Sequence, residues 1–275
     1  MFSDSHAHIF MILQRNNADF SFLTEIKEKN YRFLMDIGTE PGDLAKRQDI
    51  FNGNIPDFIH FAAGLWPHAE SIANPKSSME ALKKDIETIL SSGAKYCALG
   101  ECGLDRYWNG SPAAERDEAG TTNIDGEEYL FKEQLKLAKE KNLSVIVHSR
   151  EAFKDTLKCI DEAGHHKGVI HCYSYGKAEA ELFLERGWYI SFPGNITYPK
   201  KQSEKDKIAE LIKSIPQDRL LLETDAPYLA PKPFRGKLNT PLLIEYTYTA
   251  VSEILDIGIP ALAEQVYINC CNCFT

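Results

Sequence analysis

The stretch "LSVIVHSREAFKDTLKCIDEAGHHKGVIHCYS", residues 143–174, holds two short apolar segments separated by an amphipathic one. Residues 143–149 and 168–174 are rich in Val and Ile, which is typical of buried strands. Residues 150–164 have a helical pattern that ends at Gly164, and glycine commonly terminates helices. A strand, a helix and a second strand in this order predict a unit of a parallel sheet.

The same alternation runs along the whole chain. The other strand segments are residues 1–8, 31–38, 58–65, 95–101, 188–194 and 219–227, and further amphipathic segments cover 78–93, 127–142, 177–187 and 204–216. Eight such units in 275 residues predict an α/β fold of the closed (β/α)8, TIM-like barrel type, with residues 1–275 as a single domain. A doubly wound open sheet is the alternative, but it usually has a Gly-rich turn after its first strand, which this sequence lacks.

Composition narrows the class of protein. The sequence contains no run of 18 apolar residues and no N-terminal signal pattern, so we expect neither a membrane association nor secretion. Its seven scattered cysteines suit a reducing, cytoplasmic setting better than a disulfide framework. A net charge of −9 argues against a protein that coats nucleic acid by bulk electrostatics. Nothing in the sequence indicates an obligate protein partner.

One connection is unusually long. Residues 106–126, "RYWNGSPAAERDEAGTTNIDG", follow the fourth strand segment and are rich in turn-forming residues. A loop after a barrel strand lies on the face where barrel enzymes hold their active sites. We therefore interpret residues 106–126 as a candidate lid, with a flexible insertion as the alternative.

Six strongly polar side chains end the apolar strand segments: His6, His8, Glu101, His148, His171 and Asp225. Buried polar groups are costly unless they are paired or bind a metal. Because the carboxyl ends of barrel strands meet at one mouth, we expect these six side chains to converge. Four imidazoles and two carboxylates predict a site for divalent cations such as Zn, Mg, Mn, Co or Ni.

The number of ligands favours two ions. Six ligands exceed the four of a tetrahedral zinc site, and Glu101 can serve two ions because a carboxylate has two oxygens. Two-metal sites hold their ions about 3.5–4 Å apart and stabilise both the attacking and the leaving oxygen of a displacement.

These stretches also carry a family resemblance. "DSHAHI", "LGECGLDRYW", "VIVHSREAF", "GVIHCYSY" and "LLLETDAPYLAPKPFRGK" resemble successive motifs of the TatD-type metal-dependent deoxyribonucleases, from residue 1 to about residue 270. The resemblance implies a TIM-like barrel that hydrolyses phosphodiester bonds, usually of DNA, with a metal-activated water. It further implies that His6 and His8 bind one metal, that Glu101 bridges, and that His148 and His171 bind the second. Asp225 would then lie at the first metal and act on the attacking water.

The expected substrate contacts follow the family pattern less closely than the metal ligands do. The family usually has "GVHPH" after the third strand, whereas this chain has "GLWPH", so Trp66 replaces the first histidine and His68 keeps the second. An indole can stack on a base but cannot replace a charge, although it can also simply pack at the rim. Arg150, Arg235 and Lys237 are the candidate phosphate contacts, with surface ion pairs as the alternative.

Two other functions remain open. An amidohydrolase that cleaves C–N bonds shares the H-x-H pattern and the last aspartate, but it commonly bridges its metals with a lysine on the fourth strand. Here that strand segment ends in Glu101, and Lys95 lies at its opposite end. A non-catalytic nucleic-acid-binding barrel is the other alternative. Outside the cluster, we expect Cys172 to point away from the ligands and His165 to be solvated.

Overall fold

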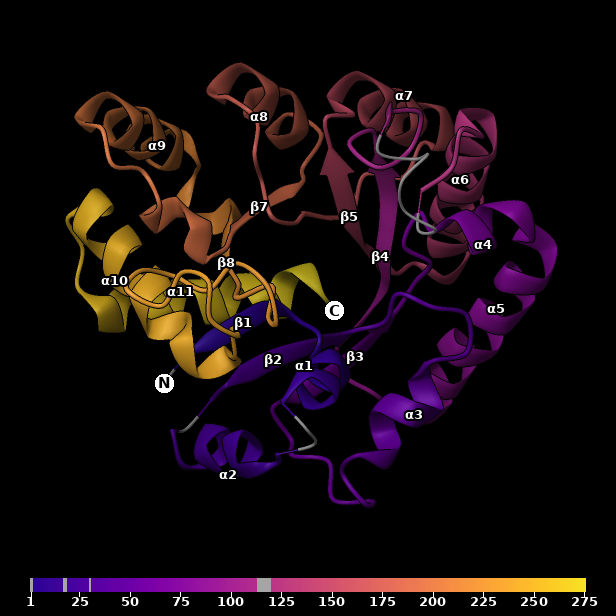
Figure 1. Cartoon of the computed structure of the whole chain (residues 1–275), viewed down its shortest axis with the longest axis horizontal. Helices are drawn as coiled ribbons and strands as arrows, with labels where there is room; N and C mark the ends of the chain where they lie inside the picture. Colours follow the sequence, from indigo (N-terminus) through magenta and orange to yellow (C-terminus); the bar gives the residue numbers. More distant parts are fainter. Residues whose placement is uncertain (1, 17–18, 30, 113–119) are drawn as a thin grey trace.

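Eight parallel strands form one sheet in the order β1 to β8 in the computed structural model, which describes residues 2–16, 19–29, 31–112 and 120–275. The strands surround a central axis, and the helices lie outside them (Figure 1). The strand bounds are β1 Ser3–Ala7, β2 Phe33–Ile37, β3 Ile59–Ala63, β4 Cys97–Asp105, β5 Ser144–Arg150, β6 Gly168–Ile170, β7 Tyr189–Phe192 and β8 Leu220–Leu222.

The first and last strands meet and nearly close the barrel. Ala7 forms a parallel bridge with Ala226, and the backbone N–H of His8 donates to the carbonyl of Ala226 over 2.7 Å. The N–H of Asp225 donates to the carbonyl of His6 over 2.9 Å. The predicted (β/α)8 barrel is therefore confirmed, and its closure places Asp225 beside the first strand.

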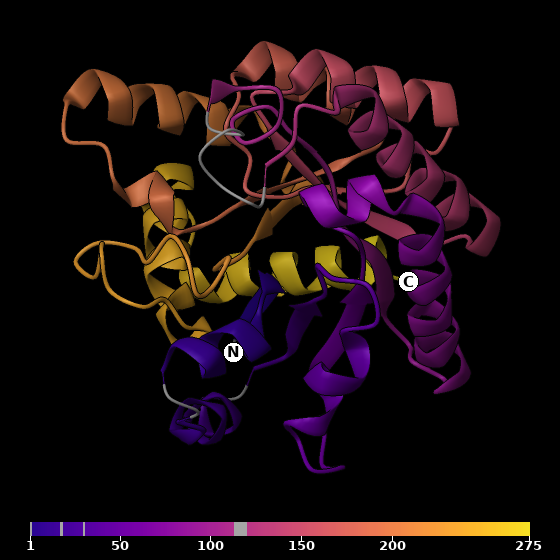
Figure 2. The same ribbon diagram turned by 45° about the vertical axis from the view of Figure 1, so that its right-hand side comes forward.

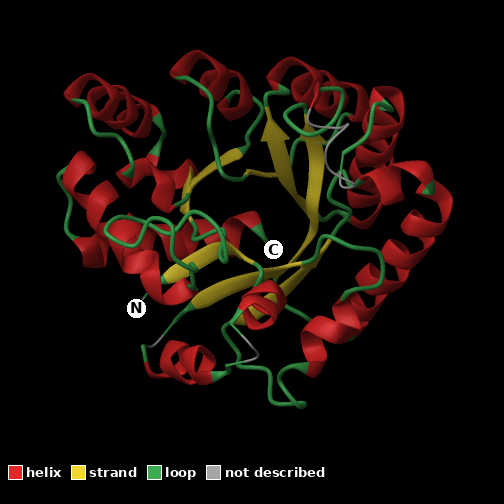
Figure 3. Cartoon of the chain, in the orientation of Figure 1, coloured by secondary structure: helices red, strands yellow, loops and turns green. Residues whose placement is uncertain are grey.

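The helices form a ring around the strands, as Figure 3 shows. No helix in the described part of the chain is both long and apolar enough to span a bilayer. The bounds are α1 Ile9–Arg15, α2 Ser21–Glu28, α3 Leu44–Asp49, α4 Ala69–Ala73, α5 Pro75–Ser91, α6 Ile124–Lys141, α7 Phe153–Ala163, α8 Lys177–Leu184, α9 Gln202–Ser214, α10 Ile244–Leu255 and α11 Ile259–Cys273, with 3-10 turns η2 Gly194–Thr197, η3 Gln217–Arg219 and η4 Pro241–Leu243.

Some predicted boundaries are wrong. β6 ends at Ile170 and β8 at Leu222, so His171 and Asp225 lie just past their strands rather than within them. The long connection is shorter than 106–126, because α6 already begins at Ile124, where the Asn123 side chain accepts the N–H of Gly126 over 3.0 Å and caps the helix. The central part of the candidate lid, residues 113–119, lies outside the described residues.

The C-terminal helix α11 covers the end of the barrel where the strands begin. The carbonyl of Phe274 accepts the N–H of Cys97 at the start of β4, and Asn269 donates to the carbonyl of Leu220 at the start of β8. Figures 1 and 2 show α11 crossing behind the strands. Since α11 occupies this end, the polar strand ends face the opposite, open end.

A buried ion-pair network holds the segments after the first two strands. The guanidinium of Arg47 donates to Asp36 Oδ2 over 2.8 Å and to Asp43 Oδ1 over 2.9 Å, and Asp36 and Arg47 are nearly inaccessible to solvent. Asp36 Oδ1 also accepts the N–H of Ile9 over 2.9 Å, at the first residue of α1. The network therefore fixes the turn that directly follows His8.

Candidate metal centre

The six polar residues predicted at the strand ends come together in the structure. His6 lies on β1, Glu101 on β4 and His148 on β5. His8, His171 and Asp225 lie in the turns directly after β1, β6 and β8. The pattern of apolar runs followed by polar residues thus located the cluster, because parallel strands of a barrel end on the same side.

Glu101 occupies the middle of the cluster. Its Oε1 lies 2.9 Å from His148 Nδ1 and 2.8 Å from His171 Nε2. Its Oε2 lies 3.5 Å from Nε2 of both His6 and His8. The two oxygens of one buried carboxylate therefore face two different pairs of imidazoles.

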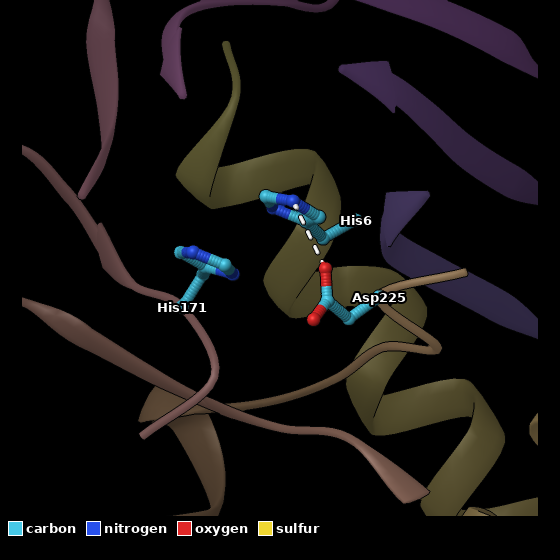
Figure 4. Close-up of side chains that lie close together, drawn as sticks. All are labelled: His6, His171 and Asp225. Atoms are coloured by element: carbon cyan, nitrogen blue, oxygen red, sulfur yellow. Dashed lines mark ion pairs between the residues drawn. The ribbon is translucent and has the colours of Figure 1, made fainter. Parts of the chain in front are cut away.

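Asp225 completes the side of the cluster next to β1. Its Oδ1 lies 3.7 Å from Nε2 of both His6 and His8. The rings of His6 and His171 stack at 4.0 Å with 5° between their planes, and the Asp225 carboxylate lies beside His6 (Figure 4). Asp225 adopts a left-handed backbone with φ of 53°, which turns the chain sharply as it leaves the barrel.

The surroundings set the charges of these groups. Burial by itself would raise the pKa of Glu101, but the attraction of His171 and hydrogen bonds from the imidazoles hold this pKa well below its usual value. Burial disfavours a charged His171, yet Glu101 and Glu223 raise the pKa of His171 well above its usual value. Burial and the nearby His171 lower the pKa of His6 to about 3. Glu101 and burial therefore act in opposite directions on the pKa values of these imidazoles.

The donor set fits divalent cations. Nε2 of His6 and Nε2 of His8 are 3.2 Å apart, and both face oxygens of Glu101 and Asp225 at 3.5–3.7 Å. Those nitrogen–oxygen distances exceed the roughly 2.7–3.2 Å of a hydrogen bond, so the two Nε2 atoms hydrogen-bond to each other and not directly to these carboxylates. Within the described residues, three sets of ligand atoms lie within 4.8 Å of one another: His6, His171 and Asp225; His6, His8 and Glu101; and Glu101, His148 and His171. Imidazole and carboxylate donors in this arrangement match transition-metal preferences.

Two carboxylates to which the sequence interpretation gave no role at the site lie beside imidazoles of the cluster. Asp105, at the end of β4, places Oδ2 2.9 Å from His148 Nε2. Glu223 places Oε1 3.6 Å from His171 Nδ1 and accepts the N–H of Cys172 over 2.6 Å. Asp105 is at hydrogen-bond distance from its histidine, as carboxylates that orient metal-binding histidines commonly are, whereas Glu223 is at ion-pair distance from His171. Both acids lie close in sequence to a carboxylate of the cluster. Asp105 is four residues after Glu101 in "GECGLD", and Glu223 is two residues before Asp225 in "ETD".

Comparison with known proteins identifies the family. The sequence profile described as "TatD related DNase" matches residues 3–275. The chain belongs to this family. The TatD resemblance of its strand-end motifs is thereby confirmed, and the chain is a metal-dependent hydrolase.

Two relatives cover nearly the whole length of this TatD-family chain, and a third covers about two thirds of it. It is 30% identical over 266 residues to "Uncharacterized metal-dependent hydrolase YabD" of Bacillus subtilis, covering 96% of this chain and 94% of the relative. The "3'-5' ssDNA/RNA exonuclease TatD" of Rahnella sp. is 36% identical over 187 residues, covering 66% of this chain and 62% of that protein. The crystal structure of the TatD homologue YjjV of Escherichia coli superposes with a TM-score of 0.80 at 26% identity, over 99% and 97% of the two chains.

A cavity of about 1060 Å³ opens above the cluster of this TatD-family protein. Trp66, His68 and Arg150, three of the predicted substrate contacts, line this cavity. The Trp66 ring meets the His148 ring edge-on at 5.7 Å, and Nδ1 of His68 accepts the N–H of Glu70 as the cap of α4. Arg235 and Lys237 are exposed and are not among the lining residues.

Two expectations outside the ligand set are wrong. Cys172 lines the cavity instead of pointing away, because β6 ends at Ile170 and the backbone of Cys172 has φ of 47°. The alternation of a strand therefore no longer applies at this residue. His165 is buried rather than solvated, and its Nε2 pairs with the carbonyl of Leu143 over 2.9 Å.

Proposed function

We propose that this chain is a divalent-metal-dependent phosphodiesterase that hydrolyses nucleic acid, with DNA as the expected substrate. The observation that carries the proposal is the position of Glu101, whose two oxygens face two separate pairs of imidazoles. A buried carboxylate shared in this way suits two cations, and two cations suit in-line displacement at phosphorus.

The proposed ligands follow this division. His6, His8 and Asp225 would hold one ion, His148 and His171 the other, and Glu101 would contact both. Bound divalent cations lower the pKa of water and offset the charge that develops on a phosphodiester during attack. Asp105 and Glu223 would orient His148 and His171 from behind.

Side chains of the cavity would accept the proton, bind the phosphate and stack on a base. Asp225 is the more exposed of the two cluster carboxylates, with a side chain 13% exposed against 5% for Glu101. Its Oδ2, which does not face His6 and His8, can accept a proton from water in the cavity. Arg150 lines the cavity and can bind a phosphate with its planar guanidinium. Trp66 can stack on a base of an unpaired strand beside His148.

Two features support a nucleic acid over other ester substrates. The Rahnella relative is named as an exonuclease of single-stranded DNA and RNA. The cavity is large for a metal centre alone and carries both an indole and a guanidinium. All seven cysteines are free, which suits the reducing cytoplasm as the proposed location.

The deciding experiment is a metal-dependent activity screen. The purified protein, freed of metal by a chelator and then supplied with Zn, Mg, Mn, Co or Ni, is offered a phosphodiester, a phosphomonoester and an amide. We expect hydrolysis of the phosphodiester that vanishes without metal and returns with it. Hydrolysis of the amide alone would instead support the amidohydrolase alternative. Binding of oligonucleotides without any cleavage would support a non-catalytic barrel.

A further inference from the structure

The arginines of this acidic protein fall into two groups. Eight lie in the described residues, and five of these form ion pairs with carboxylates: Arg32, Arg47, Arg106, Arg186 and Arg219. For Arg15, Arg150 and Arg235 the described residues provide no carboxylate within ion-pair distance. Each of these three lies over a tyrosine ring, at 4.4, 3.8 and 4.3 Å respectively, as do Arg32 and Arg219, which also pair with carboxylates.

All three of these Arg–Tyr stacks lie on the face that carries the metal centre. Arg15 ends α1, which follows β1, and Arg150 is the last residue of β5. Arg235 lies in the connection after β8. Their tyrosine partners follow β8, β4 and β7, so every member belongs to a segment that leaves the barrel at its carboxyl end.

The Arg15–Tyr228 stack directly adjoins the metal ligands. The Tyr228 ring stands edge-on to the His8 ring at 6.3 Å, and its side chain lines the cavity although 40% of the residue is exposed. Arg15 Nη2 donates to the Tyr228 hydroxyl over 2.9 Å. The tyrosine thus holds an exposed guanidinium at the rim without neutralising its charge.

The other two stacks extend this arrangement around the mouth. Arg150 lines the cavity next to His148, and β4 and β5 lie across the barrel from β8 and β1. Tyr198 closes the 3-10 turn η2, whose Asn195 lines the cavity. Arg150 therefore lines one side of the cavity and the Arg15–Tyr228 stack borders the opposite side through Tyr228, with the Arg235–Tyr198 stack outside it.

We propose that the three Arg–Tyr stacks bind separate phosphates, several nucleotides apart, of a single-stranded polynucleotide that crosses the metal centre, with Arg15–Tyr228 as a backbone subsite. This inference rests on the proposed phosphodiesterase function and narrows its substrate to a strand long enough to reach both sides of the cavity. Guanidinium forks bind phosphates, and the exposed tyrosine ring offers a surface on which a base can stack. In a chain with net charge −9, such local cations determine where a polyanion can approach.

The test compares a long and a small phosphodiester in the metal-loaded enzyme. The probes are a ten-nucleotide oligo(dT), the corresponding oligo(U), and bis(4-nitrophenyl) phosphate, which is too small to span the cavity. For Arg15→Gln we expect the ratio of kcat/KM on the ten-mers to kcat/KM on the small ester to fall roughly 5- to 20-fold. The slope of log kcat/KM against log salt for the ten-mers should become shallower by about 0.7, the value for one phosphate contact on a single strand.

Two further variants provide the controls. Arg15→Lys keeps the charge but loses the planar guanidinium. Most of the salt slope should therefore remain, and the ratio of kcat/KM on the ten-mers to kcat/KM on the small ester should fall less than in Arg15→Gln. Arg219→Gln removes a guanidinium that lies 5.0 Å from the Tyr189 ring at the opposite end of the barrel, and should change neither quantity.

The outcomes separate this inference from the proposed function. An unchanged ratio and salt slope in Arg15→Gln would overturn the subsite. A wild-type enzyme that hydrolyses the small ester but prefers no ten-mer would overturn the polynucleotide inference and leave the phosphodiesterase standing. A wild-type enzyme that hydrolyses neither probe with any metal would overturn both.

Discussion

Asp105 Oδ2 lies 2.9 Å from Nε2 of His148, while the other ring nitrogen of His148 lies 2.9 Å from Glu101. The second oxygen of Asp105 accepts the backbone N–H groups of Tyr107 and Trp108, each over 3.0 Å. Both oxygens of this buried carboxylate are therefore occupied. The arrangement fixes which nitrogen of His148 faces the cluster and connects it to the loop after β4.

Replacing Asp105 by asparagine should weaken metal binding. The amide has the same shape but only one acceptor oxygen, so either His148 or the loop N–H groups lose their partner. We expect the dissociation constant of the more weakly held metal to rise about 10- to 100-fold. Metal titration by calorimetry measures the change. Asp155→Asn is the matched control, since Asp155 pairs with Arg106 beside the same loop and does not contact the cluster. Equal metal affinity in both variants would contradict the orienting role.

Glu101→Gln tests the shared carboxylate. The amide is isosteric with the acid but presents an N–H group to one of the two imidazole pairs and removes the negative charge between them. We expect the bound metal to fall below the wild-type stoichiometry and turnover to drop by several orders of magnitude, about the loss seen when one member of a catalytic unit is removed. Elemental analysis and steady-state kinetics provide the two measurements. Glu70→Gln makes the same change on an exposed residue of the cavity wall. Full metal content and full rate in Glu101→Gln would rule out a bridging carboxylate.

His60 provides a test of stability that is independent of the metal centre. It lies on β3 between the rings of Phe33 and Tyr96, with ring centroids 4.6 and 5.0 Å away. Burial, together with the charge of Lys95, lowers the pKa of His60 to about 4. The unfolded chain, whose histidines titrate near 6.5, therefore binds this proton more tightly than the folded protein does. Above about pH 6.5 the histidine is neutral in both states and its titration does not change the free energy of unfolding. As the pH falls from about 6.5 towards 4, the unfolded chain takes up the proton first and the free energy of unfolding decreases.

His60→Phe should remove this part of the acid sensitivity. Between pH 7.5 and pH 5 the free energy of unfolding of the wild type should fall by about 1–2 kcal/mol more than that of the variant. Urea denaturation at the two pH values measures the difference. A ring-proton titration of His60 by NMR gives an independent value. Parallel loss of stability in both proteins, or a titration midpoint above pH 6, would show that burial does not depress this pKa.

The sequence predicted most of the barrel and all six residues of the cluster, and the reason is local. Glu101 and His148 follow apolar runs directly, and a barrel brings every such strand end to one mouth. The predicted strand segment ends at residue 101, whereas β4 continues to Asp105 through Gly103. The φ angles of Gly100 and Gly103 are 152° and 146°, and a Cβ on Gly103 would lie 1.9 Å from the carbonyl oxygen of His148. These glycines therefore permit the close approach of β4 to β5 rather than ending the strand.

Contacts between distant residues could not be predicted in this way. Arg15 and Tyr228 are 213 positions apart, and only closure of the barrel between β1 and β8 brings them together. The role of α11 was also missed, since its partners at the starts of β4 and β8 become neighbours only after the barrel has formed. Periodicity identifies which face of an element is buried but not the element it packs against.

Asp225 and Glu223 are two residues apart, yet the structure gives them different surroundings. Glu223 is fully buried beneath His171 and accepts the N–H of Cys172, whereas the carboxylate of Asp225 lies beside His6 and His8 and reaches the cavity. We therefore expect Glu223 to be a positioning residue whose loss acts through the orientation of His171. We expect Glu223→Gln to weaken metal binding, with activity largely restored at saturating metal.

Asp225→Asn should behave in the opposite way. The amide oxygen can still face a cation, but it cannot take the proton of the attacking water. A general base of this kind contributes about 10²–10⁴-fold to rate, so kcat should fall by that factor while KM for an oligonucleotide stays within a fewfold of the wild-type value. Saturating metal should not restore the rate, which distinguishes this variant from Glu223→Gln. The pH profile provides a second measurement, since the loss of a base removes the acidic limb of kcat that the carboxylate produces. If Asp225→Asn raises KM and leaves kcat unchanged, Asp225 positions the substrate and a different group accepts the proton.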